Sequence, residues 1–157
     1  VSSIDIKGKK GTLVIFMCNH CPYVLHVIHE LVKIGYEFMN QGIGIVAISA
    51  NDVENYPEDH PSKMKELGLS LKFPFPYLYD ETQEVAKLYD AACTPDFNLF
   101  DKKGNCVYRG QLDESRPGND KSVTGSDLRI AMELVVKGSK VPINQIPSCG
   151  CNIKWKV

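Results

Sequence analysis

Three successive segments of the chain constrain its fold more than any other feature. The apolar run TLVIFM, residues 12–17, does not alternate with polar residues, which is typical of a strand covered on both faces. Residues 22–41 then repeat apolar side chains at helical spacing, with charged side chains on the opposite side. A second apolar run, IGIVAIS, occupies residues 43–49. This order predicts a βαβ unit with parallel strands and a right-handed crossover, and hence an α/β fold.

An irregular, proline-containing insert follows this unit over residues 51–76. Within it we expect a short helix at residues 62–67. Residues 77–79 predict a brief strand, and residues 81–91 predict a helix. The apolar side chains of that helix expected to face inward are those of Val85, Leu88 and Tyr89.

The last part of the chain predicts an antiparallel hairpin and a closing helix. The hairpin covers residues 97–111, with Gly104 in a turn that requires positive φ. Residues 124–127, TGSD, predict a capping box ahead of a helix at residues 128–137. The tail, residues 141–157, shows no clear period.

Composition limits the class of protein. The 157 residues, of which 43 % are apolar, suit one domain over residues 1–157. A formal net charge of −1 gives no attraction to nucleic acid or to an anionic membrane, and no apolar run is long enough to span a membrane. The first ten residues lack the apolar core of a secretory signal. We therefore expect a cytoplasmic protein, with the periplasm as the alternative.

The six cysteines are unevenly spaced along the chain, which favours a redox or metal-binding role over a set of structural disulfides. Cys18 and Cys21 form a CxxC motif directly after the first predicted strand and at the start of the long helix. Cys149 and Cys151 form a CxC pair in the tail. The CxxC motif is interpreted either as a redox couple or as half of a metal site.

These features, and several longer motifs, resemble the thioredoxin-like superfamily. The motifs are CNHCPYV, CTPDFxLFD, YRGQLDxSRP, TGxDLR and GCNIKWK, and they extend from Cys18 to Lys156. They are most similar to uncharacterised bacterial thioredoxin-like proteins of the branch that contains the TlpA/ResA thioredoxins and the alkyl hydroperoxide reductase/thiol-specific antioxidant proteins. The resemblance implies a mixed central sheet flanked by helices, with an αβ insert after the second strand. It also implies an extra strand pair before the first strand found here, so we expect the N-terminus to be incomplete.

The resemblance further implies the roles of five residues. Cys18 is expected to attack a disulfide as a thiolate and Cys21 to resolve the mixed disulfide, with Pro95 as a cis-proline facing them. The backbone of Thr94 is expected to pair with a substrate strand. A helix N-terminus favours a thiolate, so the pKa of Cys18 should be lowered. His20, between the cysteines, is expected to stabilise that thiolate when protonated and to make the couple more oxidising than thioredoxin.

The expected partners are protein dithiols or disulfides, or glutathione, and we expect no organic cofactor. The accessory thiols are Cys93, Cys149 and Cys151. Cys93, next to Thr94, is interpreted as a packed thiol, and the alternative is that it is a third redox partner. Cys106 is interpreted as a small buried hydrophobic residue. Of the two tail cysteines, Cys151 is the better candidate for disulfide exchange with the CxxC motif. An equal alternative is that the tail is purely structural, packing against the domain through Ile153 and Trp155. The polar residues of the hairpin and the following loop are read as an edge and turn network: Arg109, Gln111, Asp113 and Arg116.

Two rival functions remain. Peroxiredoxins resemble P-x-x-x-T-x-x-C, but Gly11 and Ile15 occupy the proline and threonine positions here, so peroxide reduction is the weaker alternative. The four clustered thiols also suit structural zinc. A proline over the pair argues against coordination, and we expect no metal.

Overall fold

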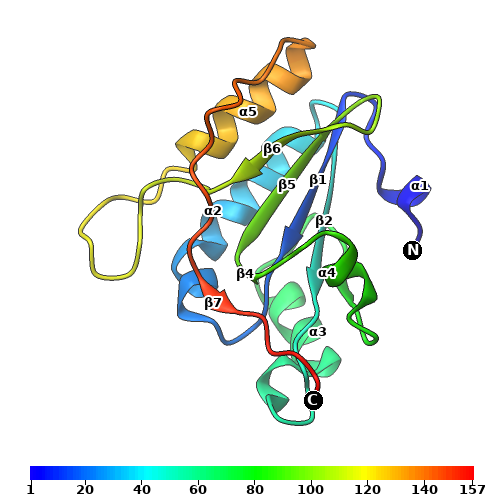
Figure 1. The fold of residues 1–157 in the computed structure, drawn as a ribbon, viewed down its shortest axis with the longest axis vertical. Helices are drawn as coiled ribbons and strands as arrows, with labels where there is room; N and C mark the ends of the chain where they lie inside the picture. Colours follow the sequence, from blue (N-terminus) through cyan, green and yellow to red (C-terminus); the bar gives the residue numbers. More distant parts are fainter.

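A mixed five-stranded sheet forms the centre of the molecule. The computed structural model describes residues 1–157, and its strands run in the order β3-β2-β1-β5-β6 (Figure 1). Strands β1, β2 and β3 are parallel, whereas β5 pairs antiparallel with β1 and with β6. The mixed sheet expected from the sequence is confirmed. The bounds are β1 Gly11–Phe16, β2 Ile43–Ser49, β3 Tyr77–Tyr79, β5 Asp96–Asp101 and β6 Cys106–Gly110.

Alternate residues of β1 enter two separate cores, because successive side chains of a strand point to opposite faces. Leu13 and Ile15 belong to the larger core, which also contains residues of α2 (Pro22–Met39) and α5 (Ser126–Lys137). Val14 and Phe16 belong to a smaller core with residues near α4 (Glu84–Leu88) and with Ile153 of the tail. Helices therefore cover both faces, which explains why the first strand shows no polar alternation.

The long helix α2 begins where the sequence predicted. Cys21 is its N-cap and Pro22 its first residue, a position where proline costs little because the first N–H groups have no partner within the helix. Its inward stripe is buried: Val24, Ile28, Leu31 and Phe38. On its outer side, Glu30 lies 2.6 Å from the guanidinium of Arg129, which ties α2 to α5.

The insert after β2 contains the helix η1 (Pro57–Asp59) and the helix α3 (Pro61–Ser70). Helix α3 is longer than the six residues expected at 62–67, because Pro61 occupies its first position and His60 accepts a hydrogen bond from the N–H of Ser62. Met64 is its buried residue. The insert thus lies against the sheet and brings η1 to the end of β1.

Three expectations about local structure are wrong. Helix α4 has five residues and starts after Gln83 at φ 64°, and Val85 and Leu88 are 37 % and 83 % exposed, whereas Ala86 is buried. Cys106 is exposed at the start of β6, so it is not a buried hydrophobe. Helix α5 has Gly125 as its N-cap, which has no side chain to form a capping box.

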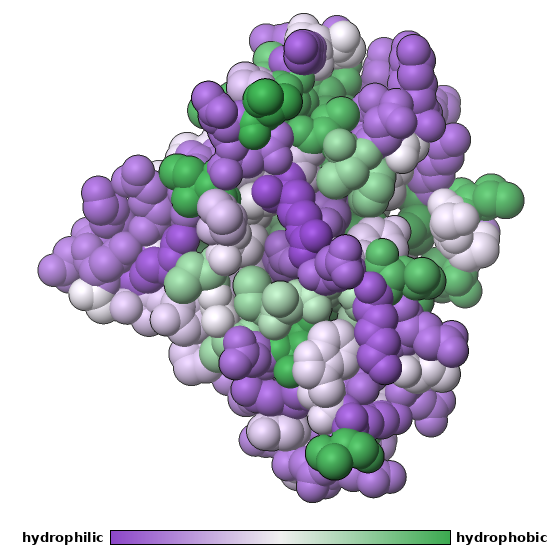
Figure 2. Space-filling model, in the orientation of Figure 1, coloured by the Kyte–Doolittle hydropathy of each residue, from purple (hydrophilic) through white to green (hydrophobic).

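The hairpin and the tail complete the fold. Gly104 has φ 87° in the β5–β6 turn, as the sequence predicted. The loop between β6 and α5 projects from the body and presents hydrophilic side chains in Figure 2. The tail forms a short strand, β7 (Cys151–Asn152), that pairs antiparallel with β4 (Cys93–Thr94). Its Ile153 is buried, while Trp155 is 40 % exposed.

The first ten residues contain one short helix, α1 (Ser3–Ile6), and no strand precedes β1. None of the helices combines the length and the apolar character that crossing a membrane would require.

Candidate active site

The turn between β1 and α2 brings both cysteines of the CxxC motif against Thr94. The sulfur of Cys18 lies 3.7 Å from the hydroxyl oxygen of Thr94, and the sulfur of Cys21 lies 3.5 Å from its carbonyl oxygen. The Thr94–Pro95 peptide bond is cis, as the resemblance implied. Cys18, Cys21, Thr94 and Pro95 are therefore neighbours, although β4 lies far from α2 in the sequence.

Both sulfurs are buried. Cys18 is 1 % and Cys21 is 0 % exposed, so neither side chain is open to solvent. Thr94 and Asp59 lie beside Cys18, and strand β7 of the tail covers the Thr94 edge. All six cysteines are free thiols in this structure.

The N-terminus of α2 supplies hydrogen-bond donors to the sulfurs. A helix begins with N–H groups that have no partner within the helix, and they favour negative charge. Here the N–H of Cys21 points to the sulfur of Cys18, and the N–H of Val24 points to the sulfur of Cys21. The N–H of Tyr23 points to a third sulfur, that of Cys151.

The titrations of the two motif thiols depend on each other. Hydrogen bonding from the Cys18 thiol to the Cys21 thiolate lowers the pKa of Cys21 to about 4, against the opposing effect of burial. The same hydrogen bond, followed by burial and by the negative charge of Asp59, raises the pKa of Cys18. The pair therefore loses one proton readily and holds the second tightly. From the sequence, the lowered pKa was expected for Cys18. In the structure it belongs to Cys21, because Cys18 acts as the hydrogen-bond donor and lies near the carboxylate of Asp59.

The remaining proton has two positions available. On Cys18 it is donated to Cys21. On Cys21 it is donated to the carbonyl oxygen of Thr94, and the charge then moves to Cys18, beside the Thr94 hydroxyl and the N–H of Cys21. The geometry thus allows either sulfur to carry the thiolate.

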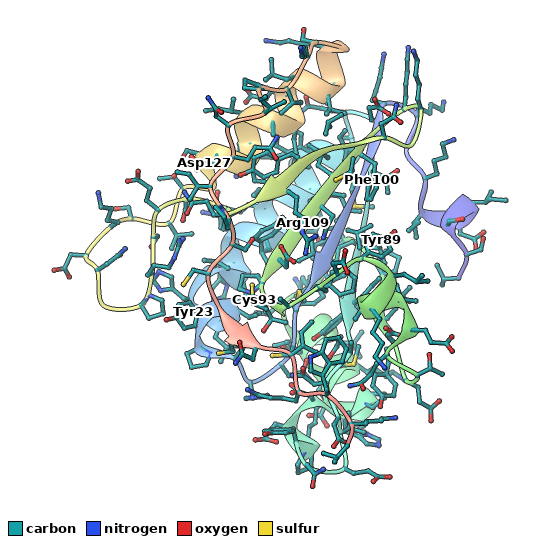
Figure 3. All side chains as sticks on the ribbon, viewed as in Figure 1. Tyr23, Tyr89, Cys93, Phe100, Arg109 and Asp127 are labelled. Atoms are coloured by element: carbon teal, nitrogen blue, oxygen red, sulfur yellow. The ribbon has the colours of Figure 1, made fainter.

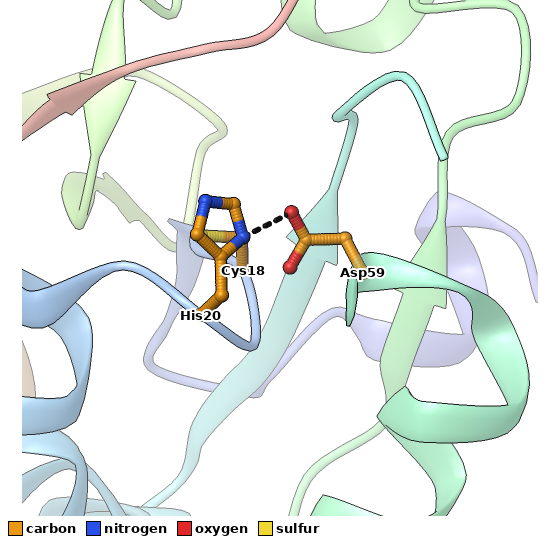
Figure 4. A group of neighbouring side chains, drawn as sticks. All are labelled: Cys18, His20 and Asp59. Carbon is orange, nitrogen blue, oxygen red and sulfur yellow. Dashed lines mark ion pairs between the residues drawn. The ribbon is translucent and has the colours of Figure 1, made fainter. Parts of the chain in front are cut away.

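A buried acid from the insert lies beside the motif. Oδ2 of Asp59 lies 2.6 Å from Nδ1 of His20, within ion-pair distance although not aligned as a hydrogen bond, and the Asp59 side chain is fully buried (Figure 4). The His20 ring stacks on Tyr56, with 5.9 Å between ring centroids and 8° between planes. His20 therefore points to Asp59 as well as to the region of Cys18.

Two hydrogen bonds hold the carboxylate of Asp59 in place. The N–H of Asn19 donates to Oδ1 at 2.8 Å, and the side-chain amide of Asn51 donates to Oδ2 at 2.8 Å. Sequence reasoning missed Asp59, which lies in an irregular segment without periodicity. One signal was available for Asn51: it lies two residues after the end of β2, and the carboxyl ends of parallel strands meet at one edge of the sheet.

The sequence matches the family model described as Redoxin over residues 1–128. The chain belongs to the Redoxin family. No curated protein matches it. Membership of the Redoxin family, together with the fold, supports a thioredoxin-like redox function.

Solved structures are similar to this Redoxin-family chain. An uncharacterized conserved protein from Geobacillus kaustophilus is 56 % identical, with a TM-score of 0.97 over 99 % of this chain and 82 % of that one. A hypothetical protein from Sinorhizobium meliloti is 44 % identical, with a TM-score of 0.96; the match covers 98 % of this chain and 84 % of that protein. A secreted disulfide oxidoreductase from Mycobacterium tuberculosis shares the fold at 13 % identity, with a TM-score of 0.62; the match covers 85 % of this chain and 87 % of that protein.

The accessory thiols of the Redoxin-family chain differ in position. Cys93, labelled in Figure 3, lies on β4, and its sulfur lies 3.9 Å from the carbonyl oxygen of Ser148. Burial, followed by the charge of Asp96, raises the pKa of Cys93 to about 11, which agrees with a packed thiol. Cys149 is exposed, whereas Cys151 is half-buried against the core that contains Cys18 and Cys21.

The polar residues after β6 form the expected network. Arg116 donates to the side-chain oxygen of Gln111 at 2.6 Å, and the carboxylate of Asp113 accepts from the N–H groups of Thr124 and Gly125. Arg109 has a separate position, 3.5 Å from the carboxylate of Asp96. A pocket beside Pro95 reaches this network; its lining includes Tyr23, Arg116 and Cys149.

The donor atoms that could hold a metal are not the four thiolates that the sequence suggested. Potential ligand atoms of Cys18, His20 and Asp59 all lie within 4.8 Å of one another. Cys151 reaches the motif but Cys149 remains exposed, so a tetrahedral set of four sulfurs is not assembled. Two of the three candidate ligands already contact each other, and the carboxylate accepts two hydrogen bonds.

Proposed function

We propose that this protein is a thiol–disulfide oxidoreductase in which Cys18 and Cys21 are the redox couple. The observation that carries the proposal is the arrangement of the two sulfurs. They lie at the N-terminus of α2, both contact Thr94, and Cys18 lowers the pKa of Cys21 to about 4, so one thiolate is available at neutral pH.

The reaction begins when the shared proton lies on Cys21 and Cys18 is the thiolate. The sulfur of Cys18 attacks one sulfur of a substrate disulfide, the substrate S–S bond breaks, and its other sulfur leaves as a thiolate and takes up a proton. Cys21 then loses its proton and attacks the sulfur of Cys18. The second substrate sulfur leaves as a thiolate, the substrate has gained two electrons, and the Cys18–Cys21 disulfide has formed. The reverse sequence oxidises a dithiol.

His20 supports the proposal that the couple is more oxidising than thioredoxin. A couple becomes more oxidising when its reduced, thiolate-containing form is stabilised. Asp59 opposes a thiolate at Cys18, and the imidazole of His20, 2.6 Å from that carboxylate, offsets the negative charge when it carries a proton. The proposed partners are protein dithiols or disulfides, or glutathione. A cytoplasmic location stays a prediction from the sequence.

Variants of the single cysteines test this assignment. Reduced protein is mixed with a disulfide-linked peptide, and peptide release is followed over time. We expect Cys18→Ser to abolish exchange on the time scale of the wild-type reaction, and Cys21→Ser to accumulate a mixed disulfide between Cys18 and the peptide. Cys106→Ser is the matched control, because Cys106 is exposed on β6 and contacts none of these groups. Full exchange activity in Cys18→Ser would overturn the proposal.

A further inference from the structure

The tail strand β7 occupies the edge that a substrate strand is expected to use. It lies beside β4 (Figure 1) and pairs antiparallel with it. Cys151 lies opposite Thr94 in this pairing. Thr94 precedes the cis-proline and contacts both motif sulfurs. The chain therefore places one of its own cysteines where the disulfide of a docked substrate would have to lie.

The approach of the tail to this edge is close and specific. A Cβ atom on Gly150 would lie 1.9 Å from the carbonyl oxygen of Thr94, so only glycine allows the two backbones to meet there. Beyond β7, the N–H of Ile153 donates to the carbonyl of Ala92 at 3.1 Å, and the N–H of Lys154 donates to the side chain of Asn51 at 2.9 Å. These contacts fix the position of Cys151.

Three sulfurs consequently gather over the first turn of α2. Cys151 lies opposite Thr94, whose hydroxyl and carbonyl oxygens contact the sulfurs of Cys18 and Cys21. The side chain of Cys151 packs against the core that contains both cysteines, and hydrogen bonding from Cys151 is one cause of the lowered pKa of Cys21. Cys21 thus stands between two thiols, each of which could form a disulfide with it. The other tail and edge cysteines lack this contact: Cys149 is exposed, and Cys93 points to the carbonyl oxygens of Ser148 and Pro95.

We propose that Cys151 is a third redox-active thiol, which exchanges with the Cys18–Cys21 disulfide at Cys21. The proposal rests on the function proposed above, because it uses the disulfide that the couple forms. The sulfur of Cys151 loses its proton and attacks the sulfur of Cys21. The Cys18–Cys21 bond breaks, the Cys21–Cys151 bond forms, and Cys18 leaves as a thiolate that takes up the proton. No electrons enter or leave the protein.

The exchange alters what the oxidised protein can do. With the disulfide stored between Cys21 and Cys151, Cys18 is again a free thiol and can attack a second disulfide. In the reduced protein, burial, followed by the hydrogen bond and the charge of Cys21, raises the pKa of Cys151 to about 11. Two of these three effects come from reduced Cys21 and disappear when Cys21 is in a disulfide, so oxidation itself favours the attack.

Disulfide mapping in variants that lack Cys18 tests the proposal. Cys18→Ser, Cys18→Ser/Cys151→Ser and Cys18→Ser/Cys149→Ser proteins are reduced, oxidised with oxidised glutathione, alkylated, digested and analysed by mass spectrometry. We expect Cys18→Ser to lose two hydrogens and to yield a Cys21–Cys151 peptide pair. Adding Cys149→Ser should preserve this pair, and adding Cys151→Ser should abolish it. A Cys21 that remains a thiol, stays bound to glutathione, or pairs with Cys149 or Cys93 overturns the proposal.

A second pair of samples separates this proposal from the one on which it rests. Oxidised wild-type protein should contain a fraction with Cys18 alkylated and Cys21 joined to Cys151, and Cys151→Ser should lose that fraction while still forming the Cys18–Cys21 disulfide. A Cys151→Ser protein that cannot form the Cys18–Cys21 disulfide, yet keeps the wild-type circular dichroism spectrum, contradicts the proposed function itself. A wild-type protein without Cys21–Cys151 linkage contradicts only the role of Cys151.

Discussion

Oδ2 of Asp59 lies 2.6 Å from Nδ1 of His20, so the insert after β2 supplies a buried acid to a motif that lies between β1 and α2. The carboxylate is fully buried and is also held by Asn19 and Asn51. A buried charge is costly unless it is paired and hydrogen-bonded, and these contacts meet that requirement. The insert is therefore part of the candidate site and not only a covering of the sheet.

Asp59→Asn is expected to make the couple more oxidising. The charge of Asp59 disfavours a thiolate at Cys18, so its removal stabilises the reduced form. We expect the potential of the Cys18–Cys21 couple to rise by about 30 mV, which corresponds to about tenfold in the redox equilibrium constant. Equilibration with glutathione buffers measures the potential. An unchanged or lower potential in a folded Asp59→Asn protein contradicts the role given to this charge.

His20→Phe should change the potential in the opposite direction. Phenylalanine can keep the stacking on Tyr56 but lacks the ring nitrogen that faces Asp59. The carboxylate then acts on the thiolate without compensation, and we expect the potential to fall by about 30 mV. His29→Phe, in helix α2 and outside the motif, is the matched control. Equal shifts in the two variants would show that the effect is not specific to His20.

The sulfur pair predicts a thiolate that persists in mildly acidic solution. The hydrogen bond from Cys18 lowers the pKa of Cys21 to about 4, compared with about 8.5 for a free cysteine. With a lowered pKa the thiolate is present above that value and disappears as the pH falls through it. We expect the ultraviolet thiolate absorbance of one sulfur to remain constant from neutral pH to about pH 5 and then to be lost.

Cys18→Ala provides the comparison for this titration. It removes the hydrogen bond that is the largest cause of the lowered pKa of Cys21, so the loss of absorbance should move to higher pH. Cys106→Ser should leave the curve unchanged. A reduced wild-type protein in which all thiolate absorbance disappears near about pH 8.5 is incompatible with the sulfur pair described here.

Gly150→Ala is expected to expose the motif. The added Cβ would lie 1.9 Å from the carbonyl oxygen of Thr94, so β7 must separate from β4. We expect alkylation of Cys18 to become about tenfold faster, equivalent to about 1.4 kcal/mol less free energy for local opening. Gly68→Ala in α3 is the control, because its Cβ would lie 3.5 Å from the ring of Phe73, at ordinary contact distance. Equal alkylation rates in the Gly150→Ala and wild-type proteins contradict the covering role of the tail.

The central sheet could be predicted because its signals are local. The first βαβ unit is long and strongly patterned, and β2 and β3 have the predicted bounds. The CxxC motif and Thr94-Pro95 could be placed together because the resemblance supplied their relation. Periodicity was less reliable for α4, where Gln83 and Asp90 at positive φ limit the helix to five residues and leave Leu88 in solvent.

The remaining parts of the site depend on contacts between distant segments. Asp59 lies in an irregular insert, and no spacing rule relates it to His20. The pairing of β7 with β4 involves two residues on each strand, which is too short for any alternation to be seen. The covering of the Thr94 edge follows from this pairing, so the sequence could not indicate it.

The most direct test of the central claim is disulfide mapping by differential alkylation and mass spectrometry in defined glutathione buffers, with zinc measured in the same samples. We expect Cys18 and Cys21 to close and reopen reversibly, at a potential above the value of about −270 mV for thioredoxin. If these thiols instead resist alkylation until a chelator removes one equivalent of zinc, the motif is part of a metal site and the redox assignment is wrong.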